Sequence, residues 1–200
     1  LLQGDGIGLL VEGFDLPPAM GIAYNLPYYP DLITGVGFKK LADYYSGYLK
    51  PETLKIPKKV VRIAEKVKKR RGFWVKNCES KDELLKEASK VRKVYNAAFS
   101  GGEGFSPITE DEMDIVANRI ASLADPRMIK LVYKGEELVG FLFAYHNIGD
   151  GLRKANGKLW PFGWFHIMRE FKKTKRADAN GIGILPEHQG LGATAILYTE

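Results

Sequence analysis

Residues 181–198 of this 200-residue chain read Gly181-Ile-Gly-Ile-Leu-Pro-Glu-His-Gln-Gly-Leu-Gly-Ala-Thr-Ala-Ile-Leu-Tyr198. The stretch predicts an apolar strand, a turn that begins at a proline and contains two glycines, and the start of an apolar helix. Small residues let a ligand approach the backbone of such a turn, and the first N–H groups of a helix have no partner within the helix. The pattern therefore predicts a phosphate-binding turn.

The composition is that of a folded protein. Hydrophobic residues make up 45% of the chain and aromatic residues 12%, which is ample for a core. With Cys78 as its one cysteine, the chain has no internal disulfide, and a cytoplasmic location is expected. The longest strongly apolar run, residues 138–145, is far too short to cross a bilayer, so no membrane partner is expected.

The two ends of the chain suggest a piece of a longer protein. The chain begins at Leu1 without a methionine, and it stops at Glu200, shortly after the predicted last helix begins. A helix of about two turns is marginal on its own. We therefore expect further residues on both sides.

The second part of the chain alternates helical and strand patterns. The expected order is a strand, two helices, two strands joined by a hairpin turn, an amphipathic helix and a final strand. Capping boxes open the first two helices at Ser80 and Thr109. The expected ranges are 72–76, a helix from 81, a helix from 110, 128–133, 138–145, 161–173 and 176–185. This order predicts a mixed α/β layer.

The first part of the chain is expected to be a strand at 19–24, a helix at 27–34 capped by Asn25, and a strand at 38–49. A proline-containing linker at 51–57 and a helix at 58–70 follow. Ten Lys or Arg and one acid, Glu65, lie between Lys55 and Lys76, so the charge of this helix is strongly positive.

The order of elements and the glycine turn together resemble the GNAT acyltransferase superfamily. Pro186, Gln189, Gly190 and Gly192 match the superfamily's signature, whereas Thr194 stands where Gly or Ala is expected. The resemblance implies an α/β (α+β) GNAT-like fold with a mixed central sheet flanked by helices. It also implies transfer of an acyl group from an acyl-CoA.

The beginning of the chain resembles the end of such a domain. Asn25, the Gly37-Phe38 pair and the run after it carry this likeness. The implied arrangement is tandem, with both halves incomplete: the end of a first domain at 1–50, a basic linker helix at 51–71, and a second domain at 72–200. Residues 8–15, 24–29 and 185–190 also resemble a group of long bacterial tandem GNAT-like proteins.

The resemblance implies a cofactor site for the pyrophosphate of acetyl-CoA or another acyl-CoA, with an amine as the acceptor. Ile184 and Leu185 would offer main-chain groups to the pantetheine arm and the acyl carbonyl. Backbone N–H groups of the turn would hold the pyrophosphate. The expected cofactor-binding residues are Ile184, Leu185, Gln189, Gly190, Leu191, Gly192, Ala193 and Thr194.

Acyl transfer needs a base that removes a proton from the amine. His146, after a buried strand, and Asp178, in the last strand, are the candidates, against the alternative that each is an ordinary surface or loop residue. Glu187 and His188 are expected to be solvated. The general acid, usually a tyrosine, would lie beyond residue 200, and its counterpart in the first domain is Ile33, which cannot donate a proton.

Other readings stay open. The chain could be a non-catalytic scaffold or binding module, and a homo-oligomer is an alternative to a monomer. The basic helix could bind nucleic acid, although a docked linker helix is favoured because no aromatic residues interrupt it. An aromatic cluster of Trp160, Phe162, Trp164 and Phe165 is expected in the core or a cleft wall. The three histidines are dispersed, so no metal site is expected.

Overall fold

A computed structural model describes residues 8–19, 21–47, 55–102 and 105–200. The chain divides into two compact units. One comprises Leu1–Lys55 and Asn147–Thr174, and the other comprises Ile56–His146 and Lys175–Glu200. None of the described helices is both long and apolar enough to cross a lipid bilayer.

The second unit is built on an open four-stranded sheet. Its strands are β1 (Phe73–Asn77), β2 (Ile129–Lys134), β3 (Glu137–His146) and β4 (Ala177–Ile184), in that spatial order. All three strand pairs are antiparallel, whereas the sequence predicted a mixed sheet. The predicted strand ranges agree to within about two residues. The hairpin turn between β2 and β3 places Gly135 at a φ of +61°, a value that favours glycine.

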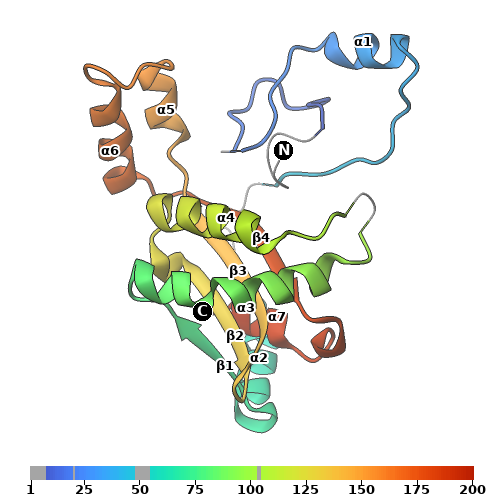
Figure 1. Ribbon diagram of the computed structural model, residues 1–200, viewed down its shortest axis with the longest axis vertical. Coiled ribbons are helices and arrows are strands. Elements are labelled where there is room, and N and C mark those ends of the chain that lie inside the picture. The colour runs from blue at the N-terminus through green and yellow to red at the C-terminus, as the bar shows by residue number, and fades with distance from the viewer. Residues whose placement is uncertain (1–7, 20, 48–54, 103–104) are drawn as a thin grey trace. The chain divides into compact units, whose positions relative to one another are not determined.

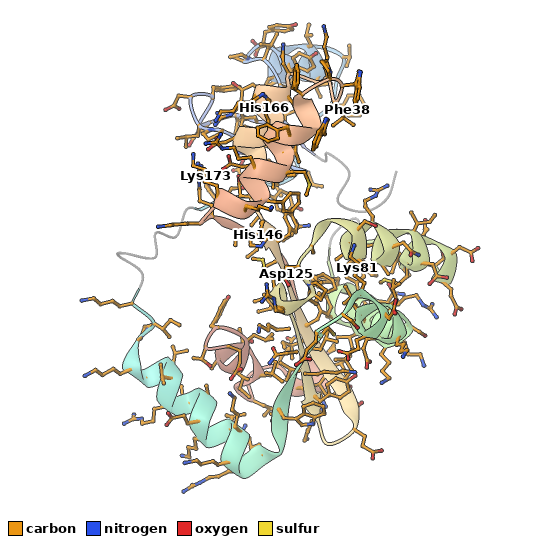
Figure 2. All side chains as sticks on the ribbon, turned by 90° about the vertical axis from the view of Figure 1, so that its left-hand side faces the viewer. Phe38, Lys81, Asp125, His146, His166 and Lys173 are labelled. Carbon is orange, nitrogen blue, oxygen red and sulfur yellow. The ribbon has the colours of Figure 1, made fainter. Side chains whose placement is uncertain are left out.

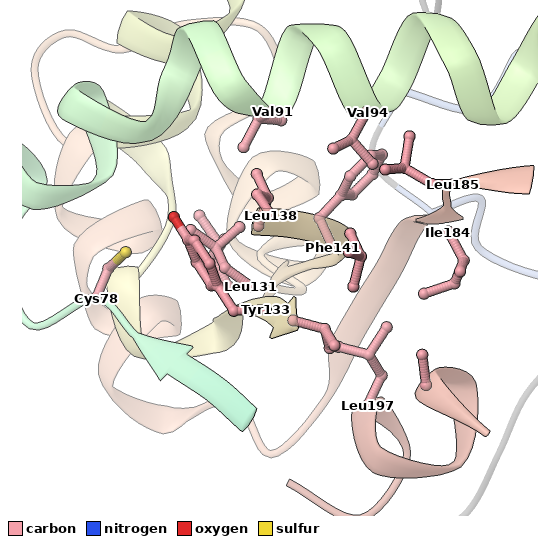
Figure 3. Packing of buried hydrophobic residues seen from close by; sticks show 14 of the residues in the cluster. Cys78, Val91, Val94, Leu131, Tyr133, Leu138, Phe141, Ile184, Leu185 and Leu197 are labelled. Carbon is pink, nitrogen blue, oxygen red and sulfur yellow. The ribbon is translucent and has the colours of Figure 1, made fainter. Parts of the chain in front are cut away.

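Helices cover both faces of this sheet (Figure 1). One face carries α3 (Lys81–Phe99), which packs against α4 (Glu110–Leu123), and the other carries α7 (Ala193–Leu197), which packs against α2 (Lys58–Arg71). In Figure 3, Val94 of α3 lies beside Phe141 and Val91 points toward Leu138, while Leu197 of α7 lies on the opposite side of the strands. The core is therefore two apolar layers with the sheet between them.

The two predicted helix starts differ in their capping. Thr109 forms a complete capping box with Glu112. The Ser80 hydroxyl also accepts a bond from the Glu83 N–H at 3.2 Å, but the Glu83 carboxylate accepts from the Glu79 N–H rather than from Ser80. The box at Ser80 is thus only half formed. A short 3-10 turn, η1 (Pro126–Met128), separates α4 from β2.

The helical hairpin in the first unit consists of α5 (Gly149–Ala155) and α6 (Gly163–Lys173). Glycine lets the helices approach, because a Cβ on Gly151 would lie 2.9 Å from the Glu170 Cβ. The sequence placed the aromatic residues of this region in a core or a cleft wall, and their exposure shows that the core alternative is wrong. The exposed fraction is 80% for Trp160, 70% for Phe162 and 49% for Phe165.

The described part of the rest of the first unit has little regular structure. Its helix α1 spans Tyr29–Gly35, and neither strand predicted in this part appears among its described residues. Asn25 does not cap α1, whose N-cap is Tyr28. The Asn25 side chain instead accepts a hydrogen bond from the Leu10 N–H at 2.6 Å and donates one to the Leu10 carbonyl at 3.3 Å. Met20, residues 48–49 and most of the predicted linker lie outside the described residues.

The basic helix α2 belongs to the same compact unit as the sheet. Its range agrees with the prediction, and Ala64 and Val67 are buried as expected. Val61, predicted on the same side, is 38% exposed. The arrangement of tandem GNAT-like domains remains a prediction.

Candidate functional site

A pocket of about 320 Å³ opens where β4 leads into the glycine turn. It is lined by Ile182, Ile184, Gln189, Gly190 and Thr194. Four of these five were predicted to bind the cofactor, and Ile182 was missed. Alternation along β4 could have found it, because residues two apart on a strand face the same side. Four of the predicted cofactor residues thus line one pocket.

The other predicted cofactor residues lie outside the lining of this pocket. Leu185 and Ala193 are buried in the core, and Leu191 and Gly192 are half-buried. The Leu185 N–H donates to the Val139 carbonyl at 2.9 Å, so this group is used within the fold. The Ile184 carbonyl accepts from Gln189 Nε2 at 3.1 Å. These bonds fix the start of the turn.

The turn itself begins with η2 (Pro186–His188) and leads to the first residues of α7. Within the described part of the chain, none of the backbone N–H groups of residues 190–194 donates a hydrogen bond of normal geometry. The Arg71 guanidinium donates to the Leu191 carbonyl at 3.0 Å and so brings a cation to the turn. Unengaged N–H groups beside a cation favour an anionic ligand.

The two glycines of the turn have different surroundings. Both have positive φ, +69° at Gly190 and +98° at Gly192, where side chains are strained. A Cβ on Gly192 would lie 2.7 Å from Val67 Cγ2 of α2, whereas a Cβ on Gly190 would meet no atom within 4 Å. Gly192 therefore serves helix packing, whereas Gly190 faces open space.

The two candidate bases lie at the far end of the β3–β4 pair. Asp178 pairs with Tyr145, and His146 pairs with Ala177. Because paired residues share a face and successive residues alternate, Asp178 and His146 lie on opposite faces. The structure therefore does not bring together the two residues that the sequence placed in one cleft.

A bulge in β4 decides which face each candidate occupies. Phe143 pairs with Gly181 and Ala144 with Ala179, so Asn180 is an extra residue. His146 consequently shares its face with Ile182 and Ile184 of the pocket. Asp178 shares the face on which Gly183 lies near Ala98 of α3.

His146 has an acidic neighbour in Asp125 (Figure 2). The hydrogen bond from Arg127 holds the pKa of Asp125 below its usual value, and the nearby His146 lowers this pKa further. Asp125 also accepts a bond from the Arg127 N–H at 3.0 Å. The carboxylate is thus ionised and lies close to the candidate base.

His188 is 8% exposed, so the expectation of a solvated side chain is wrong for this residue. Its ring meets Phe73 edge-on at 6.0 Å, and its Nε2 lies 3.6 Å from a carboxylate oxygen of Glu137. Together with Glu187, these groups put three potential metal-ligand atoms within 4.8 Å of one another. Both carboxylates are exposed, and such groups are common without a metal.

Comparison with known proteins finds similarity to two curated bacterial proteins. The chain is 25% identical over 184 residues to Protein YghO of Escherichia coli K12. The matched region covers 91% of the chain and 46% of that protein. The chain is 28% identical over 169 residues to bacterial ceramide synthase of Caulobacter vibrioides. This matched region covers 83% of the chain and 42% of that enzyme.

The chain spans less than half the length of each of these relatives. No family model matches it. The similarity to the two proteins supports an acyltransferase-type relationship for this chain.

Proposed function

We propose that the second unit binds an acyl-CoA and takes part in N-acyl transfer. The observation that carries this proposal is the pocket at the end of β4, which adjoins the unengaged N–H groups of residues 190–194. Those groups suit a pyrophosphate, and Ile182 and Ile184 offer an apolar wall to the pantetheine arm. GNAT membership is part of the same proposal.

The reaction would begin with a neutral amine. The nitrogen attacks the thioester carbonyl carbon, a base takes the amine proton, and the C–S bond breaks to release CoA as the thiolate. His146 is the favoured base, because it shares the pocket's face of the sheet. It lies roughly 13 Å along β3 from the level of Ile182, at about 3.3 Å per residue. The pantetheine arm would bridge this separation.

The acceptor class follows from one relative. A ceramide is an N-acylated long-chain amino alcohol, so a ceramide synthase forms an amide of the kind proposed. We therefore propose a long-chain amine as the first acceptor to test. The second candidate, a non-catalytic acyl-CoA-binding module, is favoured by the separation of Asp178 from His146.

Calorimetric titration of acetyl-CoA into the full-length protein tests the site. Thr194→Glu places a carboxylate in the pocket, where it would repel the phosphates, so we expect Kd to rise at least about tenfold. Ser89→Glu adds the same charge at an exposed position of α3 and should leave Kd unchanged. Thr194 avoids the positive φ that would complicate a substitution at Gly190.

Three results would count against this function. Binding that stays undetectable up to about 1 mM acetyl-CoA contradicts the site. Equal Kd values for the two variants contradict its position. Binding without release of CoA in the presence of long-chain amines identifies the non-catalytic module.

A further inference from the structure

The α5–α6 hairpin presents an apolar face that the described structure leaves uncovered. Phe162 precedes α6, and Trp164, Phe165 and Met168 lie within it, with exposed fractions between 49% and 70%. Leu159 and Trp160, in the loop between the helices, are 65% and 80% exposed. A contiguous exposed set of large apolar side chains of this kind marks an interaction surface.

The packing of the hairpin explains why this face points outward. The close approach of Gly151 to the His166 carbonyl and the Glu170 Cβ shows which side of α6 contacts α5. At 3.6 residues per turn, Trp164 and Met168 lie on a different side of α6. The polar side of the helix therefore faces α5, and the apolar side faces away from it.

The hairpin that carries this apolar face also has an excess of cations. Residues 147–174 contain six Lys or Arg and two acids. Four of the hairpin's charged groups, together with His166, line a pocket of about 260 Å³ on the polar side: Lys154, Arg169, Glu170 and Lys173. Two copies docked through this hairpin would bring like charges together, so the charge favours an anionic partner.

We propose that the α5–α6 hairpin docks on the surface of a bilayer that contains anionic phospholipids. Trp and Phe side chains are favoured at the boundary between headgroups and acyl chains, and Lys and Arg are attracted to anionic headgroups. One apolar face suffices for such docking, so no membrane-spanning helix is needed. The proposal departs from the expectation of no membrane partner, which considered only a spanning segment.

Vesicle binding by the full-length protein tests this proposal. The vesicles would contain phosphatidylcholine alone or phosphatidylcholine with phosphatidylglycerol. Of the chain's three tryptophans, two lie in the hairpin, so a Trp74→Phe background confines the fluorescence to Trp160 and Trp164. We expect a blue shift and co-sedimentation with the anionic vesicles, and weakening of both as salt is raised.

The key variant is Phe162→Ser with Phe165→Gln. Serine is favoured at the N-cap, which Phe162 occupies, so α6 should persist while two apolar side chains are lost. We expect binding to the anionic vesicles to weaken roughly tenfold or more. Ile115→Gln, at an exposed apolar position of α4, should bind like the parent.

The outcomes separate this proposal from its rivals. Unchanged fluorescence with anionic vesicles, or equal binding by the double variant, overturns it. A dimer that sedimentation shows to dissociate in the double variant overturns it in favour of a second copy. Acetyl-CoA titration of the double variant without vesicles reports on the other unit, so failure of docking is distinguishable from failure of the acyl-CoA site.

Discussion

Glu87 is the most strongly perturbed acid described in this fold. It lies on α3 with only 4% of its surface exposed, yet Lys76, Lys90 and the Tyr133 hydroxyl all contact its carboxylate. Burial opposes ionisation of this carboxyl, but the three donors outweigh burial and lower its pKa to about 2. The same contact and burial raise the pKa of Tyr133. The network fastens α3 to β1 and β2.

Glu87→Gln should destabilise the protein near neutral pH and flatten its pH dependence. An unfolded glutamate has a pKa of about 4.3, so its lowered folded pKa contributes stability above that value and loses it as pH falls toward 2. We expect a loss of about 2 kcal/mol at neutral pH and a smaller difference in acid. Urea unfolding across this pH range measures both. Parallel pH profiles for the two proteins would contradict the assigned role.

At the scale of elements, the glycine turn of the candidate site packs closely against α2. Gly192 is the N-cap of α7 and faces Val67 and Ile63 of α2. The sequence analysis assigned both turn glycines to ligand approach. Packing against α2 accounts for the glycine at 192, whereas ligand binding at either glycine stays a prediction.

Gly192→Ala should therefore cost more stability than Gly190→Ala. Both changes strain a residue with positive φ, at about 1 kcal/mol each. Only the alanine at 192 also overlaps α2, which adds typically 1–3 kcal/mol. Urea denaturation of the pair isolates the packing cost. Equal destabilisation by the two changes would show that α2 shifts to accommodate the added methyl group at no cost in stability.

The elements with regular periodicity were predictable, and those that depend on distant partners were not. Helices α3 and α4 follow from apolar spacing and a capping residue, which are local signals. A strand needs a partner strand, and the alternation of residue types at 38–49 does not show whether a partner is available. For α6, periodicity predicts the apolar face but not whether anything covers it.

The candidate site was likewise predictable only in its local features. The turn was predictable, because its proline and glycines act within a few residues of chain. The faces of His146 and Asp178 depend on one extra residue in β4, and no local pattern marks a bulge at Asn180. The network around Glu87 was missed, since its members come from three separate elements.

At the scale of the whole molecule, the chain leaves the second unit at the end of β3 and returns at β4. His146 and Ala177 are paired across the two strands, so the points of departure and return are adjacent. The α5–α6 hairpin is thus inserted between neighbouring antiparallel strands. A short turn is sufficient to join such strands.

Replacing residues 148–174 with a short Gly-containing turn should leave the second unit folded. The core residues that the structure describes come from both sides of the insertion, and none of them lies within it. We expect cooperative urea unfolding and retained acetyl-CoA binding, with loss of binding to anionic vesicles. Non-cooperative unfolding would show that the sheet depends on the inserted hairpin.

The bulge in β4 has a consequence for how this site could vary. Asn180 has no partner on β3, so its deletion would leave Asp178 opposite Tyr145 and the two candidate bases on opposite faces. Regular pairing that kept Asn180 would instead bring Asp178 opposite His146, on the side occupied by Ile182 and Ile184. The chemistry available at this edge of the protein is therefore controlled by strand register as much as by residue identity.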